Sequence, residues 1–188
     1  FATDGSASNS PAQSAAMVDV FADRFHWRSN VIVAGGAVRI VDTSNKVSFS
    51  CDALEAQQAA NASEDETAVA TGNVTVEREG ASIRAKRADY SKRAGAVVFT
   101  GSPHWQQAQI EGSAERVTFK TGVNEVEADK DVAVKITIPN KGGGSPLAFF
   151  PQGGTNQTAQ VIELSSRRLN LKERQALFSG QVAAHQSP

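Results

Sequence analysis

The sequence lacks the residues that cross-link a small fold. Cys51 is the only cysteine among 188 residues, so the chain can form no internal disulfide and no cluster of thiolate metal ligands. Cys51 is the last residue of the stretch Val47–Cys51, in which apolar residues occupy alternate positions. This setting predicts a small buried side chain rather than a reactive thiol.

An excess of charge of either sign is also missing. The chain carries 19 Lys and Arg against 20 Asp and Glu, and its net charge of −1 offers no long-range attraction to nucleic acid or to an anionic membrane surface. No apolar run approaches the roughly 18 residues that a membrane-spanning helix needs. The chain begins at Phe1 rather than Met, so we interpret it as a processed or trimmed product without the signal peptide or anchor of a precursor.

The motifs of common enzymes and metal sites are absent from the sequence. No Gly-x-Ser-x-Gly turn, His-x-x-x-His pair or Gly-x-x-x-x-Gly-Lys loop occurs, and His26, His104 and His185 are far apart. Acidic residues such as Glu77 and Glu111 alternate with apolar ones, which is typical of a solvated strand face, although a carboxylate pair formed between distant segments stays open. We predict no catalytic residues, no metal ligands and no cofactor.

Valine is abundant. The chain has 19 Val against 6 Leu. Side chains branched at Cβ are stiff and fit the pleated surface of a sheet better than a helix. The composition therefore predicts an all-β chain.

A short motif recurs in the chain: a glycine or another small residue, a turn residue and then valine, within segments of alternating polarity. Successive copies lie about 30 to 50 residues apart, a spacing typical of repeat proteins in which each copy is one supersecondary unit. The longest step contains the Gly/Pro-rich stretch 139–159, which we interpret as a loop insertion. The copies are Gly36-Ala37-Val38, Gly72-Asn73-Val74 and Gly180-Gln181-Val182, with the degenerate forms Gly101-Ser102-Pro103 and Asp131-Val132.

Alternation of apolar and polar residues predicts strands along most of the chain. Residues 1–16, rich in Ser, Ala and Asn, are predicted to be a disordered leader, and residues 17–188 a single domain. Residues 185–188 are expected to trail off after the last strand. The predicted strands cover 19–27, 30–34, 37–42, 47–56, 68–77, 81–85, 88–90, 96–101, 109–112, 115–120, 125–128, 131–138, 161–164, 168–171 and 176–182.

Five segments of the repeat together show a pattern of Gly-Asn-Val, Ala-x-x-Ala-x-Tyr and a Thr-Gly turn. They are Ala-Thr-Gly-Asn-Val-Thr-Val at 70–76, Ile-Arg-Ala-Lys-Arg-Ala-Asp-Tyr at 83–90, Val-Val-Phe-Thr-Gly-Ser-Pro at 97–103, Ile-Glu-Gly-Ser-Ala-Glu-Arg-Val-Thr-Phe at 110–119 and Val-Glu-Ala-Asp-Lys-Asp-Val at 126–132. These segments resemble the OstA-like family, to which the periplasmic lipopolysaccharide-transport proteins LptA and LptC and the periplasmic part of LptD belong. The resemblance covers roughly 17–138 and returns at 161–182.

The resemblance implies a fold, a place and a function. The fold would be an antiparallel β-jellyroll open along one side, an open β-taco array of strand-turn-strand units. Acyl chains of lipopolysaccharide or a related glycolipid would slide through its apolar trough while the sugars stay outside. The protein would be periplasmic and would pair edge to edge with other transport proteins of the same fold, or head to tail with itself; no nucleic-acid partner is implied.

An apolar trough can hold lipid without a catalytic site. Each buried methylene of an acyl chain stabilises the complex by about 0.8 kcal/mol, so a wall of Val and Ile binds strongly while its positions look alike. The candidate lipid-binding residues are Val74, Val76, Ile83, Phe99, Ile110, Val117, Phe119, Val126, Val132, Val134 and Ile136.

Other interpretations of the same strands stay open. The main alternative is a structural or adhesive β-solenoid with a closed core and no lipid ligand; a polysaccharide-degrading β-helix is less favoured. Trp27 and Trp105 fit core packing or the cap of a stack better than ligand contact. The basic groups at 84–87, 92–93 and 167–168 fit solvated faces and edge protection better than phosphate binding.

Two segments are expected to form the edges of the sheet. They are 18–25 at the N-terminal end and 176–182 at the C-terminal end. Near the second segment only Lys172 and Arg174 carry a charge that could discourage pairing with another chain. A proline at Phe178 is expected to weaken pairing at the second edge by removing a backbone donor.

Overall fold

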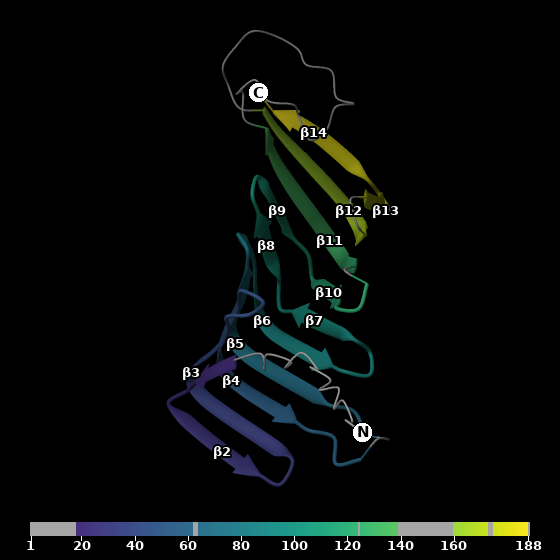
Figure 1. The fold of residues 1–188 in the computed structure, drawn as a ribbon. Helices are drawn as coiled ribbons and strands as arrows, with labels where there is room; N and C mark the ends of the chain where they lie inside the picture. The colour runs from purple at the N-terminus through teal and green to yellow at the C-terminus, as the bar shows by residue number, and fades with distance from the viewer. Residues whose placement is uncertain (1–17, 62–63, 124, 139–159, 173–174, 188) are drawn as a thin grey trace, which may run out of the picture.

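The computed structural model describes residues 18–61, 64–123, 125–138, 160–172 and 175–187, and these form one antiparallel sheet of 14 strands (Figure 1). An all-β fold is therefore confirmed. The described part contains no helix that could cross a membrane. The strands are β1 (Val18–Phe21), β2 (Arg24–Arg28), β3 (Val31–Asp42), β4 (Val47–Gln57), β5 (Thr67–Arg78), β6 (Ala81–Ser91), β7 (Ala96–Thr100), β8 (His104–Gln107), β9 (Ile110–Ser113), β10 (Arg116–Lys120), β11 (Glu125–Ile138), β12 (Gln160–Lys172), β13 (Gln175–Ser179) and β14 (Ala183–Ser187).

The sheet is a meander of bent arcs. The long strands β3, β4, β5, β6, β11 and β12 each make one arc, and the short strands join in pairs, β1 with β2, β7 with β8, β9 with β10 and β13 with β14, to make the others. Each arc pairs with the next, so the arcs stack along the long axis from β2 to β14 (Figure 1).

Every arc bends near its middle, and the bends divide the sheet into two walls. Among the described residues every strand pairing lies within one wall. Wall A contains β2, β7, β10 and β13 with residues 31–35, 53–57, 67–71, 87–91, 125–129 and 168–172. Wall B contains β1, β8, β9 and β14 with residues 38–42, 47–50, 74–78, 81–85, 132–138 and 160–166.

The recurring sequence motif forms the bend of every second arc. In each copy two successive residues have positive φ, as at Gly72 (74°) and Asn73 (47°). The strand register shifts at the copies within β3, β5 and β11, and the other two copies separate β7 from β8 and β13 from β14. A side chain at Gly72 would also collide with Asp52 of the neighbouring arc, because an added Cβ would lie 2.2 Å from the Oδ2 atom. The other pairs are Gly36 and Ala37, Gly101 and Ser102, Lys130 and Asp131, and Gly180 and Gln181.

The motif's third residue is buried in four of the five copies. Val38 and Val74 have no exposed surface, Val132 is 1% exposed and Pro103 is fully buried, whereas Val182 on the terminal arc is 53% exposed. In these four copies the motif turns the backbone with its first two residues and fills the inside of the bend with its third.

Several predicted strand limits are wrong. The segments 30–34 and 37–42 form the single strand β3, since the motif copy at 36–37 bends this strand instead of ending it. Segment 19–27 is instead broken into β1 and β2 at Ala22 and Asp23. Residues 185–187 belong to β14, paired with β12, and β8 was not predicted. The leader 1–16 and the insertion 139–159 lie outside the described residues.

Candidate functional site

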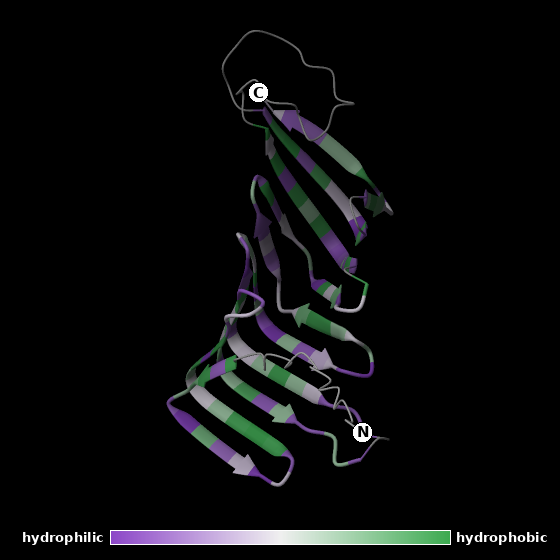
Figure 2. Cartoon of the chain, in the orientation of Figure 1, coloured by the Kyte–Doolittle hydropathy of each residue, from purple (hydrophilic) through white to green (hydrophobic). Residues whose placement is uncertain are grey.

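All eleven candidate residues lie on the same face of the sheet, the face on which the two walls look toward each other. We call it the inner face. Strand register decides this, because residues directly opposite each other in neighbouring strands share a face. Hydropathy accordingly alternates along the strands (Figure 2).

The inner face is built of rows that run across the arcs. The deep row of wall A, next to the bend, contains Phe25, Ala34, Leu54, Ala70, Ala88, Phe99, Val117, Ala128, Leu169 and Phe178. The upper row of wall A contains Trp27, Ile32, Ala56, Ala68, Tyr90, Val97, Phe119, Val126, Leu171 and Ala176. The upper row of wall B contains Val20, Ile40, Phe49, Val76, Ile83, Trp105, Gly112, Val134, Leu164 and Ala184.

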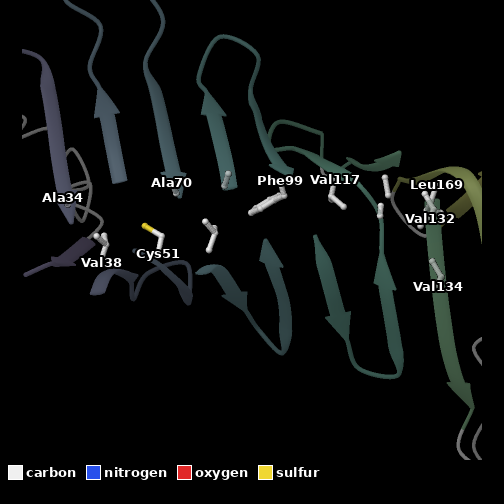
Figure 3. Close-up of a cluster of buried hydrophobic side chains, with 13 residues drawn as sticks. Ala34, Val38, Cys51, Ala70, Phe99, Val117, Val132, Val134 and Leu169 are labelled. Atoms are coloured by element: carbon white, nitrogen blue, oxygen red, sulfur yellow. The ribbon is translucent and has the colours of Figure 1, made fainter. Parts of the chain in front are cut away.

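Burial separates the candidates into two groups. Val74, Phe99, Val117, Val132 and Val134 are at most 5% exposed and belong to the buried cluster that runs between the walls (Figure 3). A ligand has little surface to touch on these five, so their main role in the described fold is packing. The candidates with surface available are Val76, Ile83, Ile110, Phe119, Val126 and Ile136.

The register adds inner-face residues that were not among the candidates. The main additions with partial exposure are Ile32, Ile40, Phe49, Tyr90, Val97, Trp105, Leu164 and Leu171. Strand alternation alone could have supplied most of them. Trp105 could not be placed that way, because β8 was not predicted.

The outer face of wall A carries ion pairs between neighbouring arcs. Arg168 Nε donates to Asp129 at 2.7 Å, and Lys120 Nζ lies 2.9 Å from Glu127 and 3.5 Å from Glu125. The hydrogen bond to Glu127 raises the pKa of Lys120, and the bond to Asp129 raises that of Arg168. The basic residue Arg168 therefore belongs to a solvated, locally neutral face, as the sequence indicated.

Two of the three histidines line one hollow, but they lie on β8 and β14, with β9, β11 and β12 between them. His104 and His185 line a hollow of about 490 Å³ on wall B, together with the outward residues Glu111, Lys135 and Glu163. Neither histidine makes a side-chain hydrogen bond within the described part of the chain. No serine is therefore oriented against a base in this hollow, as nucleophilic catalysis requires.

Metal and thiol chemistry find little support in the described residues. Among them no group of three or more His, Cys, Asp or Glu side chains could hold a metal ion. Cys51 is buried beside the bend, as predicted, and its burial, with a smaller contribution from the charge of Asp52, raises the pKa of the thiol to about 11.

The two ends of the array expose apolar side chains. Phe21, Phe25 and Trp27 are 57%, 56% and 62% exposed at the N-terminal edge, and Leu177 is 67% exposed at the C-terminal edge. Both edges are two short strands joined at a bend, β1 with β2 and β13 with β14, and not the single segments 18–25 and 176–182. Patches of this kind on sheet edges are typical of surfaces that bind another chain.

Comparison with known proteins places the fold. No protein-family model matches the chain. No curated protein matches it either. Among solved structures it is similar to LptH from Pseudomonas aeruginosa, described as the LptA-homologous periplasmic component of the conserved lipopolysaccharide transport device. The TM-score is 0.52 at 15% sequence identity, over 61% of this chain and 83% of that chain.

The fold is an LptA-like β-jellyroll. The predicted fold class is confirmed by this likeness and by the single antiparallel sheet. At 15% identity the likeness extends to the fold alone.

Proposed function

We propose that this protein is a non-enzymatic periplasmic carrier that holds the acyl chains of lipopolysaccharide or a related glycolipid against its inner face. The proposal rests mainly on the two upper rows. Apolar residues follow one another there across the arcs of both walls, and all except Gly112 and Val134 keep part of their surface exposed. A continuous apolar path suits an acyl chain, which gains about 0.8 kcal/mol for each methylene removed from water.

The similarity to a lipopolysaccharide-transport component adds support through the fold. The pattern of exposure agrees with the same function. Most inner-face side chains are buried next to the bend and more exposed away from it, although Val134 and Ile162 on wall B stay at 5% and 3% exposure. A ligand would therefore lie between the upper rows and leave its polar head outside.

Assembly by edge pairing is part of the proposal. The arc β1–β2 runs from wall B to wall A, and the arc β13–β14 runs from wall A to wall B. The C-terminal edge of one molecule could therefore pair antiparallel with the N-terminal edge of another, with Phe178 beside Phe25. Such head-to-tail contacts would join the inner faces of two copies, or of this protein and another of the same fold.

Native mass spectrometry of protein purified from a Gram-negative envelope tests the proposal. We expect a glycolipid to co-purify with the protein. Its occupancy should fall when partly exposed side chains of the inner face are substituted, and should stay the same when side chains of the outer face are substituted. Protein that carries no lipid, and acquires none from rough lipopolysaccharide in vitro, would favour the alternative of a structural solenoid.

A further inference from the structure

Trp105 occupies an unusual place on the inner face. In the upper row of wall B it lies between Ile83 of β6 and Gly112 of β9, so the largest side chain of the row stands beside the residue that has none. An added Cβ at Gly112 would lie 2.1 Å from Cζ2 and 2.2 Å from Cε2 of the indole. The indole therefore lies flat over Gly112.

Close approach, and not backbone conformation, requires this glycine. Gly112 has no positive φ and lies within β9, where any residue could adopt the backbone. It is buried although it is on the partly exposed upper row, because the indole covers it. The next residue of the row, Val134, is likewise only 5% exposed.

Part of the indole remains exposed on the inner face, near the middle of the array. On the opposite wall the same level carries Val97 of β7 and Phe119 of β10. A side chain of this size determines how much room an acyl chain has between the walls, and a flat indole leaves more room than one that stands up from the sheet.

We infer that Trp105 is a lipid-contact residue that sets the depth of the inner face at the middle of the array, and that Gly112 keeps the face open there by letting the indole lie flat. The inference rests on the proposed function. A methyl group at position 112 would lift the indole into the space between the walls, where it would exclude an acyl chain.

Fluorescence tests the contact. The chain has two tryptophans, so the Trp27→Phe variant reports on Trp105 alone. We expect dibromostearate, whose bromines quench indole on contact, to quench Trp105 as it binds, whereas stearate does not. If native mass spectrometry shows bound dibromostearate but the emission of Trp105 is unchanged, the inference is overturned and the proposed function is not.

Substitution tests the role of the glycine. Gly112→Ala should weaken dibromostearate binding about tenfold, equivalent to about 1.4 kcal/mol. The double variant Trp105→Ala/Gly112→Ala should bind as Trp105→Ala does. Gly122→Ala is the matched control, because Gly122 also has no positive φ and an added Cβ there meets nothing within 4 Å.

The outcomes separate the two proposals. Undiminished binding by Gly112→Ala overturns the inference, and if that variant fails to fold, the quenching of Trp105 decides. If neither dibromostearate nor rough lipopolysaccharide binds the unsubstituted protein, the proposed function and the inference both fail.

Discussion

Val76 and Thr75 are neighbours on β5 whose side chains lie on opposite faces of the sheet. Val76 faces Phe49 and Ile83 on the inner face, while Thr75 lies between Ser50 and Arg84 on the outer face. We expect Val76→Asp to lower lipid occupancy at least tenfold, about 1.4 kcal/mol, because a carboxylate among apolar walls loses hydration. Thr75→Asp should leave occupancy unchanged, as measured by native mass spectrometry on folded protein.

Val134→Asp should act on folding instead. Val134 is 5% exposed in the buried cluster, so an uncompensated carboxylate there should cost several kcal/mol of unfolding free energy. Denaturant titration checks this result. A Val134→Asp protein as stable as the parent would show that the cluster is not packed as described.

Cys51 provides a test by pH. Its thiol ionises near 9.0 in an unfolded chain and near 11 in the folded one, chiefly because of burial. The folded state therefore holds the proton more strongly between these values, and this group's contribution to stability is constant below pH 9.0 and declines as the pH rises toward 11. In the folded protein near neutral pH a thiol reagent should label Cys51 only on unfolding; rapid labelling would contradict its burial.

At this scale the sequence predicted the face of a side chain but not its depth. The period of two along a strand is local, so all eleven candidates fall on one face. How deeply a side chain is buried depends on its distance from the bend of its strand. Val74, next to the bend of β5, is buried, whereas Val76, two residues further along the same strand, is partly exposed.

At the scale of the element, the bend motif should be sensitive to substitution. Gly72→Ala places a Cβ against Asp52 at a φ of 74°, and we expect it to lower the unfolding free energy by roughly 2 kcal/mol. Gly122→Ala, with space around it and no positive φ, should change it by less than about 0.5 kcal/mol. Equal stabilities in thermal unfolding would show that the bend does not require glycine.

Pairing at the C-terminal edge is tested by a proline at another position than Phe178, the position that the sequence suggested. Arg167 donates its N–H to Gly180 O at 2.7 Å, and hydrogen-bonded pairs alternate along an antiparallel ladder. Phe178 therefore donates inward to β12, and Phe178→Pro would damage the fold itself. Leu177 directs its N–H outward, so Leu177→Pro should preserve the fold and abolish head-to-tail association in sedimentation.

The opposite pair of results would refute edge pairing. If Leu177→Pro oligomerises like the parent, or the parent stays monomeric at high concentration and binds no envelope protein of the same fold, the C-terminal edge is not an interface.

The strands that were not predicted are those that form only because a neighbouring strand pairs with them. Segment 183–187 contains no β-branched residue and no Phe, Tyr or Trp, and has weak strand propensity, but pairing with residues 161–165 of β12 makes it β14. The Gly-x-Val motif was evident in the sequence. Its role as a bend was not, because a pair of left-handed residues either ends a strand or bends it, according to the register of its neighbours.

For the whole molecule, the sequence predicted an all-β repeat and its resemblance implied the jellyroll. Whether the walls close on each other depends on pairings between distant segments. In the described residues these pairings stay within each wall, from the β1–β2 arc to the β13–β14 arc. The two short edges are then the places where the array can grow, and the inner face is continuous between them.

Under the proposed function, acyl chains lie against the inner face. Photo-crosslinking tests it most directly, with a benzophenone amino acid placed at Phe119 or Val126 and, as matched controls on the same strands, at Thr118 or Glu127, whose side chains lie on the outer face. With rough lipopolysaccharide, we expect adducts from Phe119 and Val126 and few from Thr118 and Glu127. Equal crosslinking from both faces, or crosslinking from the outer positions alone, would contradict it.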